Sequence, residues 1–466
     1  MKKLILFILI AAVSHAQWQE EVKLSNGSAS TAPNSRSISV SVSLVHVVYS
    51  QGYFVDGKIY YTRSTDGGKT WQNEPQLLAE DNSLYNPSVS VSGGYVHVIW
   101  QSDNGKVFYK RSTDFGITWG ETVRLINNTG AAYLPAISAS GQVVNIVWNQ
   151  SNEVYYIRSS DNGATWNSQV RFTNHPGFSY APSIYSRDSY VHLTWSDEID
   201  NNEEIFYKRS TDKGMNWDET RRLSDGASYS QWPSVSGSGS EVYVVWSDNR
   251  DSQPEIYFKR STDNGITWGA DVRLSNKYSN SSFPTLTVYK SILHVGWSDD
   301  RTGNLEIFYK RSSDYGNSWS QDVRLTYSHY WCEFPAFAVS GKTLHMIWDD
   351  KRDGDNVYYK RNPTGNMADG LAVVNPLIPV SFLLYQNYPN PFNPQTKIRF
   401  AVPVGQSVRL VIYNTMGQEV AEIVKEYLGA GTYEASFDAV NLTNGVYFYK
   451  LITADFTATK KMVLIK

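Results

Sequence analysis

Cysteine, excess charge and long apolar runs are all scarce in this sequence. Its 466 residues include one cysteine, Cys332, which excludes an internal disulfide and a zinc site built on cysteines. The 42 basic and 45 acidic residues leave a net charge of −3, which argues against nucleic-acid binding because that usually requires a basic patch. No segment beyond the N-terminus is apolar enough to span a membrane, and none shows a helical period.

The one long apolar run lies at the N-terminus. Lys2 and Lys3 precede ten apolar residues, and Ser14 and Ala16 occupy the −3 and −1 positions before Gln17. This order predicts a secretory signal peptide over residues 1–16, cleaved near Ala16. The run is too short for a membrane span, and its basic start argues against a buried first strand.

A nine-residue segment occurs six times. One copy, "RSTDNGITW", spans Arg260 to Trp268, and the tryptophans that end successive copies lie 47 to 51 residues apart. A period of this size is typical of propellers and solenoids. A second set of anchors gives seven units, because seven residues each precede an aromatic residue by 13 positions: Arg36, Pro87, Pro135, Pro182, Pro233, Pro284 and Pro335.

Each unit alternates polar and apolar residues over four short segments, which we name strands A, B, C and D. Four antiparallel strands in each of seven units predict an all-β, seven-bladed β-propeller. The seventh unit, 334–361, lacks strand D, whereas "QWQEEVKLS" (17–25) resembles the strand D sequence "TWGADVRLS" (267–275). We therefore expect the N-terminal strand to complete the last blade and remove its open edge.

The repeated nonapeptide falls at the turn between strands C and D, where its residues suit a structural role. The aspartate accepts backbone N–H groups, the glycine adopts positive φ, and the tryptophan packs on the sheet. A calcium site is disfavoured because one carboxylate per turn is too few ligands. No metal site and no cofactor are predicted, and the aspartates are assigned to structural turns: Asp66, Asp114, Asp161, Asp212, Asp263 and Asp314.

Other repeated polar residues are also interpreted as structural. Histidines recur at one position of strand B, and their placement around a ring would hold them apart. Pairs such as Asp248 with Arg250, in the loops between strands B and C, are expected to be exposed local ion pairs that contribute roughly 0 to 1 kcal/mol each.

The nonapeptide resembles the Asp box of sialidases and related propellers, over Trp18 to Arg361. The resemblance implies a fold and not an activity, and seven units depart from the usual six blades of sialidases. A retaining sialidase needs three converging arginines, a tyrosine nucleophile with a glutamate partner and a carboxylic acid. Only Arg36 breaks the proline pattern, and Glu333 is the one acidic residue just before a strand A. If the protein is an enzyme, these two flank one pocket; otherwise they pair with each other or lie on the surface.

The C-terminal segment has a second resemblance. "NYPNPFNPQTKIRFAVP" (387–403) and the alternating segments after it resemble the type A sorting domain of the type IX secretion system. The short strands predict a small β-sandwich over 381–466, after a propeller at 17–362 and a linker at 363–380. The resemblance implies recognition of residues 381–466 by the secretion machinery. It also implies passage through the outer membrane of a Gram-negative bacterium, to the cell surface or the medium.

The loops between strands D and A carry aromatic residues at the upper mouth of the propeller, where binding sites usually lie. These residues are candidates for stacking on sugar rings, although repetition favours a packing role: Tyr85, Tyr133, Tyr180, Trp232, Phe283 and Trp331. The sequence therefore favours extracellular binding of a glycan or protein. An exo-glycosidase of sialidase type and a structural surface protein are the alternatives.

Overall fold

The computed structural model describes residues 18–466, except for short segments at 32–35, 53–55, 127–129, 175–176, 200–201, 227, 276–278, 364–370, 376–378, 380, 404–405, 429–430 and 441. Every regular element in this described part is a β-strand. The predicted signal peptide lies outside it. Contacts divide the chain into a unit of Glu21–Arg361 and a second unit that contains Asn362–Lys466.

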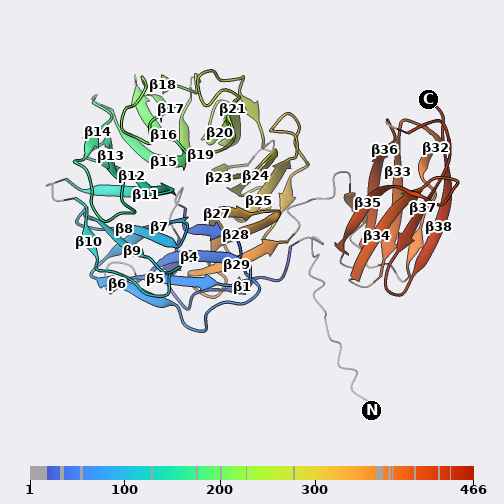
Figure 1. Ribbon diagram of the computed structural model, residues 1–466, viewed down its shortest axis with the longest axis horizontal. Helices are drawn as coiled ribbons and strands as arrows, with labels where there is room; N and C mark the ends of the chain where they lie inside the picture. The colour runs from blue at the N-terminus through green and yellow to red at the C-terminus, as the bar shows by residue number, and fades with distance from the viewer. Residues whose placement is uncertain are drawn as a thin grey trace, which may run out of the picture. The chain divides into compact units, whose positions relative to one another are not determined.

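The first unit is a propeller of seven antiparallel sheets, as the sequence predicts (Figure 1). The inner strands are β3 (Ile38–Ser41), β7 (Leu84–Ser92), β11 (Ala132–Ser140), β15 (Ser179–Arg187), β19 (Ser230–Ser238), β23 (Ser281–Tyr289) and β27 (Cys332–Ser340). Neighbouring inner strands contact each other around the ring, and β27 contacts β3, so the ring is closed. We number the blades one to seven in this order.

The other strands of each blade follow outward. The second strands are β4 (Leu44–Gln51), β8 (Tyr95–Ser102), β12 (Val143–Gln150), β16 (Tyr190–Ile199), β20 (Glu241–Asp248), β24 (Ile292–Asp299) and β28 (Thr343–Asp350). The third are β5 (Gly57–Ser64), β9 (Val107–Ser112), β13 (Glu153–Ser159), β17 (Asn202–Ser210), β21 (Glu255–Ser261), β25 (Glu306–Ser312) and β29 (Asn356–Asn362). The outermost are β6 (Gln76–Asp81), β10 (Val123–Arg124), β14 (Val170–Arg171), β18 (Arg221–Arg222), β22 (Val272–Arg273), β26 (Val323–Arg324) and, for blade seven, β1 (Val22–Lys23). In blade one, β2 (Ala29–Ser30) also pairs with β4.

The N-terminal strand completes blade seven, which confirms the expected closure. Val22 pairs with Tyr359, and the N–H of Leu24 donates to the carbonyl of Val357. The hydroxyl of Ser25 accepts the N–H of Val357 at 2.8 Å. In blade six, Leu325 and Thr326 make the same two bonds to Ile307. The N-terminus therefore substitutes bond for bond for an ordinary strand D.

A tyrosine of the third strand connects neighbouring blades. In blade four the Tyr207 hydroxyl lies 2.7 Å from Nδ1 of His192, and its ring contacts Trp268 of blade five edge-on at 4.9 Å. A Cβ on Gly265 of blade five would lie 1.9 Å from that hydroxyl. The repeated histidines thus orient an interblade contact, in the pairs His46–Tyr61, His97–Tyr109, His192–Tyr207, His294–Tyr309 and His345–Tyr359.

The Asp boxes are turns closed by their own side chains. Asp263 accepts bonds from the Thr267 hydroxyl at 2.6 Å, the Thr267 N–H at 2.8 Å, the Ser261 hydroxyl at 2.7 Å and the Ile266 N–H at 3.0 Å. These bonds lower the pKa of Asp263 to about 2. The arginine before a box also reaches the next blade: Arg209 donates to the carbonyl of Asn264 at 2.8 Å, and Arg111 donates to that of Asn162 at 2.7 Å. The boxes therefore stabilise both the turn and the ring.

The C-terminal unit is a β-sandwich of two sheets that share one strand, as predicted. One sheet holds β30 (Leu371–Asn375), β31 (Leu383–Leu384), β32 (Tyr388–Asn393), β33 (Gln395–Val402) and β36 (Gly431–Asp438). The other holds β32, β34 (Gln406–Tyr413), β35 (Glu419–Leu428), β37 (Gly445–Ile452) and β38 (Thr457–Leu464). Strand β30 lies inside the segment predicted to be a linker and pairs with β36, so the sandwich begins earlier than the sequence suggested.

Candidate functional site

Four aromatic side chains form an arc across the upper ends of the inner strands of blades four to seven. We define the upper face as the one that carries the loops between strands D and A and between strands B and C. The ring centroids of Tyr180 and Trp232 are 5.8 Å apart, those of Trp232 and Phe283 are 5.0 Å apart, and those of Phe283 and Phe334 are 4.7 Å apart. We call these four residues the aromatic arc. Phe334 was not among the residues expected from the sequence.

Backbone geometry places three of these rings. Trp232, Phe283 and Phe334 each directly precede the proline of strand A, at a β-bulge, with φ of 56°, 52° and 54°. Non-glycine residues adopt such angles infrequently and at a cost in free energy. The same bulge recurs in blades two to four with different side chains: Asn86, Leu134 and Ala181. The backbone is thus repeated, whereas the aromatic character is confined to one side of the ring.

A tyrosine–carboxylate pair adjoins the arc. The Tyr180 hydroxyl donates to Oε2 of Glu203 at 2.7 Å, and the side-chain amide of Gln231 donates to the same oxygen. Burial and the Glu203 carboxylate raise the pKa of Tyr180, so its hydroxyl is protonated at neutral pH. Glu203 comes from β17, near the loop end of its pairing with β16. No sequence signal singled it out, because the second and third strands with their loop span the same number of residues in blades one, four, five and six.

Arg36 lies in the central channel instead of facing Glu333. Its Nη2 donates to the carbonyl of Val235 at 2.8 Å, and its Cζ lies 5.5 Å from the centre of the Tyr185 ring. Glu333 instead forms an ion pair with Lys351 at 2.7 Å. The expectation that Arg36 and Glu333 pair with each other is therefore wrong, because the Arg36 side chain extends from blade one across the channel to blades four and five.

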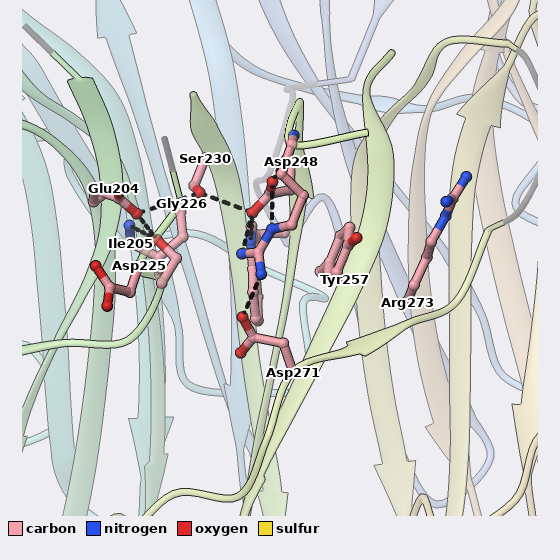
Figure 2. A network of polar contacts seen from close by, with 12 residues as sticks. Glu204, Ile205, Asp225, Gly226, Ser230, Asp248, Tyr257, Asp271 and Arg273 are labelled. Atoms are coloured by element: carbon pink, nitrogen blue, oxygen red, sulfur yellow. Dashed lines mark hydrogen bonds and ion pairs between the residues drawn. The ribbon is translucent and has the colours of Figure 1, made fainter. Parts of the chain in front are cut away.

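The other upper-face arginines belong to buried polar networks. Arg250 bonds to Asp248 at 2.6 Å and to Asp271 at 2.8 Å, and it lies over the Tyr257 ring at 4.4 Å. Figure 2 shows Asp248 beside Ser230, whose hydroxyl donates to it at 2.9 Å. The expected local pair of Asp248 with Arg250 is confirmed, but Asp248 is fully buried, so the expectation that the pair is exposed is wrong. Equivalent pairs occur in blades six and seven, at Asp299–Arg301 and Asp350–Arg352.

Two protein families match parts of this chain: "BNR repeat-like domain" over residues 139–346 and "Secretion system C-terminal sorting domain" over residues 386–466. The chain is an Asp-box propeller with a C-terminal sorting domain. The sorting domain marks it for type IX secretion to the cell surface or extracellular space. No curated protein matches it.

Several solved structures resemble the Asp-box propeller. Polysaccharide lyase Uly1 is 11% identical, with 75% of this chain and 100% of that chain covered and a TM-score of 0.52. A Trypanosoma rangeli sialidase in complex with sialic acid is 11% identical, with 91% and 88% covered and a TM-score of 0.45. The β-propeller domain of the Trilobed protease from Pyrococcus furiosus is 6% identical, with 69% and 93% covered and a TM-score of 0.44. At such identity the likeness to Uly1 shows a shared fold and nothing more.

The aromatic residues expected to form one ring in the Asp-box propeller occupy three different positions. Tyr85, Tyr133 and Tyr180 lie two residues before the proline and pair with strand B, whereas Trp232 and Phe283 lie in the bulge. Trp331 lies four residues before the proline and is 52% exposed, with the Lys351 ammonium 4.9 Å from its ring centre. The expectation of one repeated position is therefore wrong, since a shift of one residue moves a side chain to a different side of the strand.

The described part of the propeller and the sorting domain contains neither a membrane-spanning helix nor a cluster of metal ligands. No helix there is long and apolar enough to cross a membrane. No group of three or more His, Cys, Asp or Glu side chains there is arranged to hold a metal ion. Cys332 is buried, and its thiol lies 3.2 Å from Oδ2 of Asp350, in the place that a serine takes in neighbouring blades.

Proposed function

We propose that the propeller binds an extracellular glycan through the aromatic arc and the polar groups beside it. The observation that carries this proposal is the run of left-handed bulges that display Trp232, Phe283 and Phe334 side by side. Aromatic faces stack on the C–H faces of sugars, and carboxylate and amide groups such as Glu203 and Gln231 are suited to bonding sugar hydroxyls. Strained backbone of this kind gathers at functional sites.

The arginines of the upper face and the channel favour binding without sialoside hydrolysis, because they already bond to groups of the protein. A clamp on a sialic acid carboxylate uses several guanidinium groups that converge on it with paired hydrogen bonds. Arg36 donates to a backbone carbonyl, and Arg250 is held by two aspartates. Arg301 and Arg352 have corresponding acidic partners. Freeing these groups would break buried ion pairs, which costs several kcal/mol each.

A glycan array with purified protein tests the proposal. Trp232→Ala and Phe334→Ala should each lower retention of the bound glycans about five- to tenfold, since each removes a stacking face worth about 1 to 1.5 kcal/mol. Tyr315→Ala is the matched control, because Tyr315 is 42% exposed and belongs to an Asp box on the opposite face. Equal retention by all three variants would reject the arc as the site. A folded protein that retains no glycan would favour the structural surface protein.

The exo-glycosidase alternative has one observation in its favour, the bond between Tyr180 and Glu203. A tyrosine nucleophile with a glutamate partner is what the sialidase resemblance requires. We expect no release of the fluorescent group from an aryl sialoside. Hydrolysis that is abolished by Tyr180→Phe, but kept by Tyr133→Phe, would establish the enzyme instead.

A further inference from the structure

The guanidinium of Arg36 has few polar partners inside the propeller. It carries five N–H donors, and within the described part of the chain it bonds only to the carbonyl of Val235. Among the described residues no carboxylate forms an ion pair with it, and none of the residues that line the channel of about 270 Å³ is acidic. Arg36 is half-buried, and this burial lowers the pKa of its guanidinium. A charge in such a place is costly without a partner.

A serine hydroxyl bonds to the backbone of the same residue as this cation. The Ser183 hydroxyl accepts the N–H of Val235 at 3.3 Å, whereas Arg36 donates to the carbonyl of the same residue at 2.8 Å. The N–H and C=O of one residue in an extended strand point to the same side, so the Ser183 hydroxyl and the Arg36 guanidinium lie on the same side of β19. No described residue accepts the proton of the Ser183 hydroxyl. Ser234 and Ser236 line the same channel.

We propose that this channel binds a small monovalent anion of halide size between Arg36 and Ser183. The site offers a positive charge and hydroxyl and guanidinium donors, which are the groups that an anion requires. The volume admits such an ion with several water molecules, at roughly 30 Å³ of liquid volume per water. The site is independent of the glycan proposal, because its residues lie on the channel wall and not in the aromatic arc.

Anomalous diffraction from crystals soaked in sodium bromide tests the position. The full-length chain should show a bromide peak in contact with Arg36 and Ser183, and Arg36→Met should lose it. Arg187→Met is the matched control, because Arg187 is a surface arginine of β15 paired with Asp188 at 3.3 Å. A bromide-soaked crystal without a peak in the channel would overturn the proposal, as would a peak that persists in Arg36→Met.

Thermal unfolding separates a resident site from weak occupancy at soaking concentration. At constant ionic strength, replacing gluconate with chloride should raise the Tm of the wild type and of Arg187→Met by about 2 °C, the size expected when the ion is well above its Kd. Ser183→Ala should show a smaller rise and Arg36→Met none. The same rise in all four proteins would refute the site. If Arg36→Met does not fold, the rise in Tm with chloride is compared between the wild type, Ser183→Ala and Arg36→Lys.

Discussion

The lower and upper faces of the propeller use repetition in opposite ways. On the lower face, Asp114, Asp161 and Asp263 accept the same set of bonds from their own turns. On the upper face, one bulge conformation recurs in six blades, but its side chain changes from Asn86 to Trp232. Identical bonds in these turns suit a scaffold, whereas a constant backbone with changing side chains is what the proposed glycan site requires.

Of the changes considered, removing the N-terminal strand should have the largest effect on the stability of the propeller. A chain that begins at Asn26 loses the strand that pairs with β29, together with buried Leu24. We expect loss of cooperative unfolding and aggregation, measured by circular dichroism and light scattering, since an open edge results. Leu24→Ala is the milder variant and should cost about 2 to 4 kcal/mol. A truncated chain that melts like the intact one would show that closure does not depend on this strand.

Substituting a glycine of the lower face should lower the stability of the propeller by the next largest amount. Gly265→Ala combines a φ of 83° with a Cβ 1.9 Å from the Tyr207 hydroxyl, so we expect a loss of about 3 kcal/mol in urea unfolding. Gly239 of the same blade has a φ of 64° but no atom within 4 Å of its Cβ. Gly239→Ala should therefore cost only about 1 kcal/mol. Similar losses for both variants would mean that the interblade contact adds nothing.

The histidine–tyrosine pairs should make the propeller sensitive to acid. Burial lowers the pKa of His192 from 6.5 to about 3, so the native state stays neutral while the unfolded chain takes up a proton. This stability is complete above pH 6.5 and is lost as the pH falls toward 3. The matched variant is His192→Asn, because Asn145 already accepts the Tyr156 hydroxyl at 2.6 Å in blade three. Between pH 7 and pH 5 the wild type should lose about 2 kcal/mol more than this variant, measured by urea unfolding.

On the upper face, two substitutions of Trp232 should differ in their effect on stability but not in their effect on glycan binding. Trp232→Gly relieves a positive φ, whereas Trp232→Ala keeps it, so the glycine variant should be more stable by about 1 kcal/mol. Both should lose glycan retention to the same extent. A glycine variant that is less stable than the alanine variant would show that φ at this bulge is not strained.

Deleting residues 381–466 should have the smallest effect on the propeller. Its Tm should change by less than about 1 °C, because the two units have separate cores. Export should stop, with the truncated protein found in the periplasm by cell fractionation. Truncated protein in the medium would contradict the role that we assign to the sorting domain.

Much of the scaffold was predictable because it rests on local or periodic signals. The spacing of Trp268 and its counterparts indicated seven blades, and the match of 17–25 to 267–275 indicated the closing strand. The candidate site was only partly predictable. Phe334 was missed although it directly precedes Pro335, as Trp232 and Phe283 precede their prolines. Glu203 was missed because no local pattern reports which loops of a ring meet at its axis.

The sequence by itself determined the seven-fold repeat, the turn chemistry of the Asp boxes and the sorting domain, since each depends on residues near one another in the chain or on a fixed period. Only the tertiary structure decided that Trp232, Phe283 and Phe334 form a continuous arc, because a bulge in each inner strand and the closure of the ring bring them together. It also decided that Arg36 meets Val235 and Tyr185 instead of Glu333, since partners across a channel are set by the geometry of the whole ring.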